Sequence, residues 1–363
     1  MKTNNKVLEV SNNENYFDET KYKLLHGNSV EVLKTLPSNF IDCVITSPPY
    51  WKMREYDINS ENSNNEIGNE ENYKDYVTNL LSVFSEIKRV LKPTGSVWLN
   101  IGDKYNDKNL MGMPWRVAIA MQDDGWTLRN DIIWDQMKGT QSPKDRLRDV
   151  YEHVFHFVKS KKYFYECDKI RIKPEKLPSM NGNGIVSATG VSGVKYRKQI
   201  EESTILTEIE KQQALKALDN TLNRLKIGEI VDFRMTIKGT QRTYHSDNNN
   251  VSGRAKELEE KGYFIMTSDA KGYIPSDIWR IVPEDKWRKD THYAVFPEEL
   301  LINPINATCP DNGIVLDPFV GTGSSIVAAL RLGKKAIGID LSENYLETAK
   351  LRIKEQCSNR LNF

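Results

Sequence analysis

Residues 314–325, IVLDPFVGTGSS, are typical of a short buried strand, a glycine turn and the first turn of a helix. Gly321 and Gly323 would let the backbone approach a ligand closely, because glycine carries no Cβ atom. The next predicted strand, KAIGI, ends at Asp340, whose carboxylate can accept hydrogen bonds from two ribose hydroxyls. This order of elements predicts a cofactor with a nucleoside, bound at the carboxyl edge of a parallel sheet.

Three classes of cofactor compete for such a turn. A P-loop needs a lysine that GTGSSIVAALRLGKK lacks at the required place, and a dinucleotide site usually has a third glycine where this chain has Ile326. The remaining class places a carboxylate, Asp317, in the turn, where it would repel a pyrophosphate and attract a cation. S-adenosylmethionine carries a sulfonium and an ammonium and no phosphate, so charge favours it. The competing interpretation is that Asp317 caps the following helix and Asp340 is a surface acid.

Predicted strands and helices alternate on both sides of an interruption in the middle of the chain. The alternation predicts an α/β fold with a mostly parallel sheet that is covered on both faces. In the interruption, basic clusters, a glycine-rich loop and a helical run predict a separate, inserted module. The predicted divisions are a flexible N-terminal arm (1–18), the first part of the α/β domain (19–160), the inserted module (161–275) and the cofactor-binding part of the α/β domain (276–363).

The composition suits a soluble globular protein, with 39% hydrophobic and 28% charged residues among 363. No apolar run approaches the roughly 18 residues of a membrane span, and the N-terminus lacks the apolar stretch of a signal peptide. The four cysteines are scattered without a CxxC pair, which favours the reducing cytoplasm and argues against a metal site or a disulfide framework. The net charge of +1 neither supports nor excludes nucleic acid.

Residues 45–51, ITSPPYW, end another predicted buried strand with two prolines followed by two aromatic residues. Two prolines forbid regular strand pairing and fix the backbone, so core packing does not call for them. A rigid turn with exposed carbonyl groups at the end of a strand is suited to holding a flat ligand. An isolated Pro-Pro pair is otherwise read as a surface turn with an aromatic anchor.

Together, TSPPY and DPFVGTG resemble the DNA amino-methyltransferases, over about two-thirds of the chain. Their order, with TSPPY first, resembles the permuted β group, whose target-recognition module lies between the two motifs. Further similarities are RVLKPTGSVWLNIGD, NDIIWDQ with SPKDRLRDVYEHVFHF, and THYAVFPEELL. The resemblance implies a Rossmann-like fold with S-adenosylmethionine as cofactor, double-stranded DNA as partner and no metal.

The resemblance also implies the roles of the motif residues. The hydroxyl of Ser47 and the carbonyl of Pro48 would accept hydrogen bonds from an exocyclic amino group, Tyr50 would stack on the base, and the base would be flipped out of the duplex. The implied catalytic set is Ser47, Pro48, Pro49 and Tyr50. The implied cofactor-binding set is Asn28, Thr46, His292, Phe296, Pro297, Asp317, Pro318, Phe319, Gly321, Gly323, Ser324 and Asp340.

One departure concerns Asn28, where the family usually has an aspartate near the adenine of the cofactor; an amide can still form a hydrogen bond to an adenine edge.

In the inserted module, basic residues mixed with tyrosines suit phosphate contacts and base readout, although each alone also fits a solvated surface charge. The DNA-binding candidates are Trp51, Arg171, Arg197, Arg234 and Arg242.

The form TSPPY is the one most often found in cytosine-N4 enzymes, whereas adenine-N6 enzymes more often have Asp-Pro-Pro-Tyr. We therefore expect a methyltransferase acting on cytosine N4 in duplex DNA, as in restriction-modification systems, with a cognate endonuclease left open as a second partner. Two alternatives remain: an adenine-N6 enzyme, because the same turn serves both amino groups, and a DNA-binding relative without turnover. Methylation at cytosine C5 is disfavoured, because no cysteine lies in a comparable turn.

Overall fold

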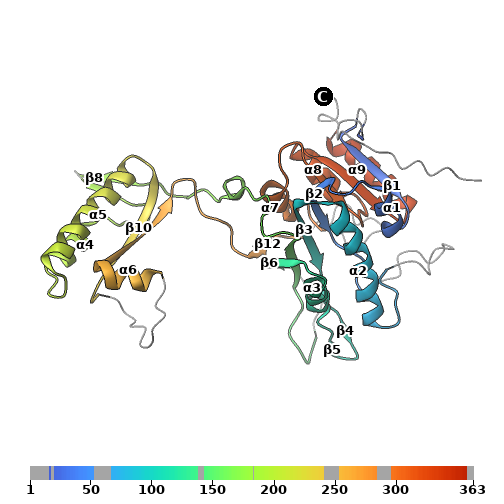
Figure 1. Ribbon diagram of the computed structural model, residues 1–363, viewed down its shortest axis with the longest axis horizontal. Coiled ribbons are helices and arrows are strands. Elements are labelled where there is room, and N and C mark those ends of the chain that lie inside the picture. The colour runs from blue at the N-terminus through green and yellow to red at the C-terminus, as the bar shows by residue number, and fades with distance from the viewer. Residues whose placement is uncertain are drawn as a thin grey trace, which may run out of the picture. The chain divides into compact units, whose positions relative to one another are not determined.

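The structure, a computed structural model, describes residues 16–17, 20–52, 67–137, 143–182, 184–240, 253–283 and 296–357 (Figure 1). It contains two compact units, of which the first is made of Met1–Ile170 and Ser276–Phe363 and the second of Arg171–Pro275. The inserted module therefore begins at Arg171 and not at residue 161. The reason lies in backbone hydrogen bonds: Phe164 N donates to Thr94 O at 2.9 Å and Glu166 N donates to Ala307 O at 2.8 Å, so this segment pairs with the first unit.

The first unit is built on one eight-stranded sheet in the order β1-β14-β13-β2-β3-β7-β6-β12. Only β7 runs antiparallel to its neighbours, so the predicted mostly parallel α/β sheet is confirmed. The strands are β1 (Tyr22–His26), β2 (Ile41–Thr46), β3 (Leu91–Ile101), β6 (Thr127–Asp135), β7 (Tyr151–Val158), β12 (Ile278–Arg280), β13 (Ile314–Asp317) and β14 (Lys335–Asp340). A small hairpin is formed by β4 (Tyr105–Asn106) and β5 (Asn109–Leu110).

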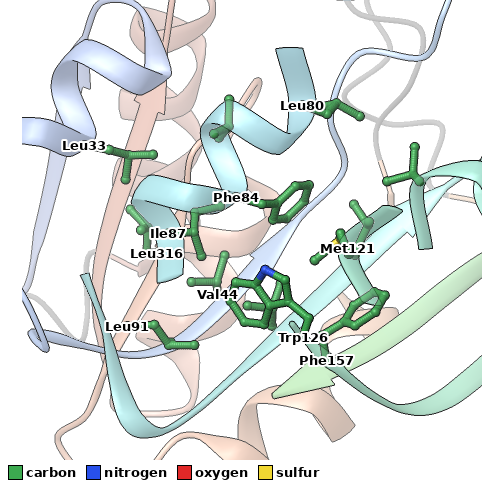
Figure 2. Close-up of a cluster of buried hydrophobic side chains, with 14 of the residues drawn as sticks. Leu33, Val44, Leu80, Phe84, Ile87, Leu91, Met121, Trp126, Phe157 and Leu316 are labelled. Atoms are coloured by element: carbon green, nitrogen blue, oxygen red, sulfur yellow. The ribbon is translucent and has the colours of Figure 1, made fainter. Parts of the chain in front are cut away.

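Helices cover both faces of the sheet because its inner strands are apolar on both sides. On β2, Val44 faces one hydrophobic cluster, which holds Leu80 and Phe84 (Figure 2), whereas Cys43 and Ile45 face the other. This alternation follows from the two-residue period of a strand. The first cluster is covered by α1 (Ser29–Thr35), α2 (Tyr73–Val90) and α3 (Met113–Asp123), and the second by α7 (Glu299–Thr308), α8 (Ser324–Arg331) and α9 (Glu343–Cys357).

The longest helix of this unit, α2, illustrates how the local sequence specifies an element. Asn72 caps it by accepting hydrogen bonds from the backbone N–H groups of Lys74 and Asp75, which satisfies donors that have no partner inside the helix. Its buried residues recur every three or four positions and form the apolar stripe that faces the sheet. No helix among the described residues is long and apolar enough to cross a membrane.

The predicted N-terminal arm lies mostly outside the described residues. Two of its residues are described, and they pack against the domain: Phe17 is buried in the first cluster, and the rings of Tyr16 and Phe40 meet edge to face at 5.1 Å. At least this part of residues 1–18 is therefore anchored, which corrects the prediction of a flexible arm there. The apolar surface that these rings bury accounts for the anchoring.

The second unit has a hydrophobic core of its own, formed mainly by α5 and β10. A capping box begins α5, because Thr207 and Glu210 bond to each other's backbone N–H groups. The elements of this unit are β8 (Ser179–Asn181), β9 (Gly184–Val186), α4 (Val194–Glu201), α5 (Glu208–Lys226), β10 (Ile230–Ile237), α6 (Arg254–Lys261) and β11 (Tyr263–Asp269). A short 3₁₀ helix, η2 (Cys167–Ile170), ends the chain segment before it.

One buried ion pair connects three helices of the first unit. Arg352 on α9 is fully buried, and its guanidinium donates to Glu298 Oε1 at 2.8 Å and to Ser324 Oγ at 2.9 Å. Glu298 stands directly before α7, and Ser324 is the first residue of α8. The guanidinium thus ties α9 to the beginnings of α7 and α8.

We expect Glu298→Gln to lower the free energy of unfolding by about 3–5 kcal/mol, because it leaves the buried Arg352 charge without its counter-charge. Urea unfolding of the full chain, followed by tryptophan fluorescence, measures the change. In the control Glu31→Gln, which removes an exposed pair with Lys34, no measurable loss is expected. Equal effects of the two substitutions would contradict this role.

Candidate active site

The two sequence motifs meet at the carboxyl edge of the sheet. Thr46 is the last residue of β2 and Asp317 the last residue of β13, and these strands are parallel neighbours. The next strands in the sheet, β14 and β1, end at Asp340 and His26, so Asn28 follows on the same edge. Parallel packing therefore brings together motifs that lie 271 residues apart in sequence.

The Asp317 carboxylate is the hydrogen-bonding centre of this edge. Its Oδ1 accepts from Thr46 Oγ1 at 2.8 Å and from the backbone N of Phe319 at 3.0 Å, and its Oδ2 accepts from Ser325 Oγ at 2.6 Å. The side chain is fully buried, and this burial raises its pKa to about 6. Asp317 does not reach the backbone of α8 as a helix cap would; it links β2, its own turn and the Ser325 side chain. A direct contact of Thr46 or Asp317 with the cofactor stays a prediction.

Both glycines of the turn have a backbone conformation that favours glycine, with φ of +50° at Gly321 and +85° at Gly323. The N–H of Gly321 donates to Asp340 Oδ2 at 2.8 Å, so the turn is tied to the acidic residue that ends β14. At Gly323, a Cβ atom would lie 2.9 Å from the Cβ of Ala349 on α9. Gly323 is therefore required by helix packing, a reason that the sequence did not reveal.

Asp340 is partly exposed at this edge, and burial raises the pKa of its carboxyl group to about 6. Its Oδ1 also accepts from the backbone N of Ser342 at 2.8 Å. Each carboxylate oxygen can accept more than one hydrogen bond. The group thus remains able to accept from ligand hydroxyls while it holds the turn.

Three further residues of the predicted cofactor set also have partners inside the protein. Ser324 is buried and its Oγ accepts from Arg352, so its hydroxyl oxygen serves the ion pair, and its contact with the cofactor stays a prediction. The carbonyl of Pro318 accepts from the buried Ser29 Oγ at 2.7 Å, a contact that sequence reasoning missed. Asn28 caps α1, because its Oδ1 accepts from the N–H groups of residues 30 and 31. Its amide nitrogen is the part that suits an adenine edge.

The remaining predicted cofactor residues are apolar or undescribed. Phe319 packs against the first hydrophobic cluster and Phe296 against the second, and both are partly buried. Pro297 is buried and its carbonyl accepts from the backbone N of Leu300. His292 lies outside the described residues.

The Ser-Pro-Pro-Tyr turn is fixed by several contacts, which excludes a loose surface turn. Tyr76 on α2 donates from its hydroxyl to the Pro49 carbonyl at 2.9 Å. Tyr50 is only 8% exposed, and its hydroxyl lies 3.2 Å from Ser47 Oγ. Its ring packs so closely on Gly102 that a Cβ there would lie 2.8 Å away. Most of the ring surface on which a base is predicted to stack is thus covered in this structure.

Trp51, which was predicted to bind DNA, lies in the interior of the protein. The side chain is 4% exposed, belongs to the first hydrophobic cluster and donates from its indole nitrogen to the Glu70 carbonyl at 2.9 Å. The assignment of Trp51 as a DNA-binding wall was therefore wrong: the residue anchors the turn from inside.

Two functional candidates escaped the sequence reading, namely Asn100 near the end of β3 and Glu152 near the beginning of β7. Both hydrogen-bond to the Tyr50 hydroxyl, at 2.6 Å each. They lie in the quoted stretches SVWLNIGD and VYEHVFHF, where a polar residue interrupts an apolar strand. A polar residue within an apolar strand is the sequence feature by which these two candidates could have been found.

The arginines of the second unit differ in their surroundings. Arg171 donates to the carbonyl of Gly272 at 2.8 Å, and Arg197 forms an ion pair with Asp219. Arg234 is exposed on β10 and has no hydrogen-bond or ion-pair partner among the described residues. Arg242 lies outside the described part of the chain. Among the described arginines of this set, Arg234 thus has the charge most available to an external partner.

Comparisons with known proteins agree with the motifs and the fold. The model of the DNA methylase family (N6_N4_Mtase) matches residues 41–351. The type II methyltransferase M.SfiI of Streptomyces fimbriatus is 28% identical, over 90% of this chain and 89% of its own. M.SmaI of Serratia marcescens is also 28% identical, over 94% of this chain and 97% of its own.

Among solved structures, the PvuII DNA methyltransferase (cytosine-N4-specific) has a similar fold, with a TM-score of 0.55 and 18% identity over 94% of each chain. The family match covers most of the chain and includes both motifs that meet at the carboxyl edge. The chain therefore belongs to the DNA methylase family and is a DNA methyltransferase that uses S-adenosylmethionine as its cofactor.

Proposed function

We propose that this enzyme methylates the exocyclic N4 amino group of a cytosine that is flipped out of duplex DNA, at a specific sequence. The observation that carries this proposal is the junction of Thr46 and Asp317, which places the Ser-Pro-Pro-Tyr turn beside the glycine turn. A methyl donor bound at one turn and an amino group held at the other would then be neighbours. Such placement supplies the proximity that a bimolecular transfer requires.

The residues at the glycine turn fit S-adenosylmethionine. Asp340 offers a carboxylate to the ribose hydroxyls, and the buried Asp317 contributes negative potential that suits a cationic ligand better than a pyrophosphate. When bound, the cofactor supplies an electrophilic methyl group on a sulfonium, and the amino nitrogen displaces the neutral thioether. No covalent protein intermediate is required for this displacement.

The Ser-Pro-Pro-Tyr turn offers two acceptors for the target amino group. Whereas Tyr76 occupies the Pro49 carbonyl, the Pro48 carbonyl accepts no hydrogen bond from the described residues. Ser47 is partly exposed. Accepting both amino hydrogens would move the nitrogen toward a tetrahedral geometry and free its lone pair. Preorganised acceptors of this kind lower the barrier without reorganisation.

The choice of cytosine over adenine rests on Ser47, because a hydroxyl can accept from the amino group and also donate toward the neighbouring ring nitrogen. The PvuII enzyme, named as cytosine-N4-specific, supports the fold and not the target. Adenine N6 is the second candidate, since the same two acceptors serve either amino group.

We also propose that the enzyme is part of a restriction-modification system with a cognate endonuclease. M.SfiI and M.SmaI, both named type II methyltransferases, are similar to this chain over nearly their whole length. The second unit would then read the DNA sequence, because it folds around its own core and presents Arg234 on an exposed strand face.

Cofactor affinity should depend on the ionised form of Asp340. Because burial raises its pKa to about 6, protonation below this pH removes the acceptor, and affinity should fall by about tenfold per pH unit. The stability of the unliganded fold should change in the opposite direction. The pKa of Asp340 in the fold lies above its unfolded value of 3.8, so its ionised form destabilises the fold. This destabilisation decreases as pH falls through 6. Calorimetric titrations of S-adenosylmethionine between about pH 5 and 7 measure the slope.

In Asp340→Asn, binding should be weaker and its pH slope shallower. A variant that keeps the full slope would show that another group is responsible. Thermal unfolding of the unliganded protein at each pH separates loss of affinity from loss of the fold.

Ser47→Ala should slow methylation by about 100-fold or more, because it removes one acceptor of the amino group. Cofactor affinity should be unchanged, and Ser82→Ala, which removes an exposed hydroxyl on α2, serves as the control. Nucleosides from DNA treated with the wild-type enzyme are identified by mass spectrometry. N4-methylcytosine is expected; N6-methyladenine would replace the cytosine assignment, and unmodified DNA would favour a binding protein without turnover.

Arg234→Ala should weaken binding of the cognate DNA by about 1–3 kcal/mol if the guanidinium contacts a base edge. A smaller, sequence-independent loss with a lower salt dependence would instead indicate a phosphate contact. Fluorescence anisotropy at several salt concentrations distinguishes these outcomes, after sequencing of methylated sites has identified the target. Arg197→Ala is the matched control, because that charge is already paired; unchanged binding in Arg234→Ala would contradict the contact.

A further inference from the structure

Behind the Ser-Pro-Pro-Tyr turn lies a hydrogen-bond network whose centre is the Glu152 carboxylate. Its Oε2 accepts from Tyr50 Oη at 2.6 Å and from Asn100 Nδ2 at 2.6 Å, and its Oε1 accepts from Gln136 Nε2 at 2.9 Å. Tyr50 Oη is also 2.6 Å from Asn100 Nδ2 and 3.2 Å from Ser47 Oγ. The network thus joins the turn to β3, to β7 and to Gln136, the residue that directly follows β6.

The charge on Glu152 determines the direction of each hydrogen bond. A carboxylate only accepts, so the Tyr50 hydroxyl donates to it, and so does one N–H of the Asn100 amide. The Asn100 amide nitrogen also lies 2.6 Å from Tyr50 Oη and 3.4 Å from Ser47 Oγ, and the Ser47 hydroxyl lies 3.2 Å from Tyr50 Oη. Ser47 therefore donates its proton toward Tyr50. Its oxygen accepts the long contact from Asn100 Nδ2 and keeps a second lone pair for an incoming amino group. Without the charge, the Ser47 hydroxyl would have no fixed orientation.

This arrangement has a measurable cost at Asn100. The residue is 5% exposed, and its buried Oδ1 has no hydrogen-bond partner among the residues that the structure describes. Leaving a buried acceptor unsatisfied costs about 1–3 kcal/mol. Turning the amide over would not relieve it, because Oδ1 would then face the Glu152 carboxylate. A network that served stability alone would not contain this defect, whereas preorganisation of Ser47 accounts for it.

We propose that Glu152 is a positioning residue for Ser47 and the final acceptor of the proton that the target amino group releases; the inference rests on the function proposed above. Once the amino nitrogen has bonded to the methyl group, it carries one proton more than the neutral product. That N–H bond breaks with its electron pair on nitrogen, and the proton passes to Ser47 Oγ. The Ser47 proton moves to Tyr50 Oη, and the Tyr50 proton moves to Glu152 Oε2. The products are a neutral methylated amine, two restored hydroxyls and a carboxylic acid.

Other carboxylates near the edge are less suited to this role. Asp317 is fully buried and already accepts from three donors of its own turn. Asp131 on β6 pairs with His153 at 2.8 Å, and His153 belongs to the opposite face of the sheet from Asn100 and Val154. Glu152, by contrast, is partly exposed and accepts a hydrogen bond from the Tyr50 hydroxyl.

The test compares Glu152→Gln, Glu152→Asp and wild type in single-turnover methylation at saturating cofactor and DNA. We expect Glu152→Gln to slow the step by about 100-fold or more and to show a rate that rises with pH between about 6 and 9, as hydroxide replaces the carboxylate. Glu152→Asp should recover part of the rate and the wild-type pH dependence. The control Asp131→Asn removes a half-buried carboxylate on the neighbouring strand and should change neither.

Two further measurements keep the inference open to refutation. Tyr50→Phe breaks the relay, so its effect should not add to that of Glu152→Gln in the double variant. In the unliganded protein, the side-chain amide signals of Asn100 should lose a downfield NMR shift in Glu152→Gln and keep it in Asp131→Asn. Cofactor affinity, measured by calorimetry, should be the same in all variants that fold.

The outcomes separate this inference from the proposed function. If wild type methylates DNA and Glu152→Gln does so at the same rate and with the same pH dependence, the relay is wrong and the function stands. Additive effects of Tyr50→Phe and Glu152→Gln would also refute it. If wild type methylates no DNA while it binds cofactor, the proposed function itself fails. Should Glu152→Gln not fold, Tyr50→Phe must still show the rising pH dependence.

Discussion

The active site depends on one buried carboxylate, Asp317. Removing a charge from water is costly unless hydrogen bonds replace the lost solvation, and here two hydroxyls and one backbone N–H do so. The same three bonds fix the end of β2 relative to the glycine turn after β13. Because Thr46 immediately precedes Ser47, the hydrogen bonds that solvate this charge also position the Ser-Pro-Pro-Tyr turn.

The two turns at this edge are stabilised in different ways. The glycine turn is closed by backbone donors on Asp340 and by the close approach of α9 to Gly323, so its shape is a consequence of packing. The Ser-Pro-Pro-Tyr turn is fixed by two prolines and by side chains from α2 and β7. Beside it, Asn100 Oδ1 is buried and accepts no hydrogen bond within the described part of the chain. Packing thus shapes the glycine turn, whereas hydrogen bonds between polar side chains hold the Ser-Pro-Pro-Tyr turn.

The chain divides into two compact units, and the motifs of the candidate active site both lie in the first. The second unit interrupts the chain after η2, and the chain resumes at β12, the edge strand of the large sheet. An insertion beside an edge strand leaves the inner strands and their cores intact. Since loop-closure entropy grows only slowly with length, a long insertion at such a place costs the fold little. Its hydrophobic core consists of its own residues, so its surface can vary without disturbing the site.

The sequence by itself determined the alternation of strands and helices, the mostly parallel sheet and the two motifs at its carboxyl edge, because these follow from local periodicity and from glycine and proline stereochemistry. Tertiary structure decided which partners the polar side chains have. Ser324 bonds to Arg352, Trp51 faces the core, and Glu152 lies against Tyr50, 102 residues away in sequence. A local pattern shows that a residue is polar or aromatic, but its hydrogen-bond partner and exposure depend on which distant strand or helix lies beside it.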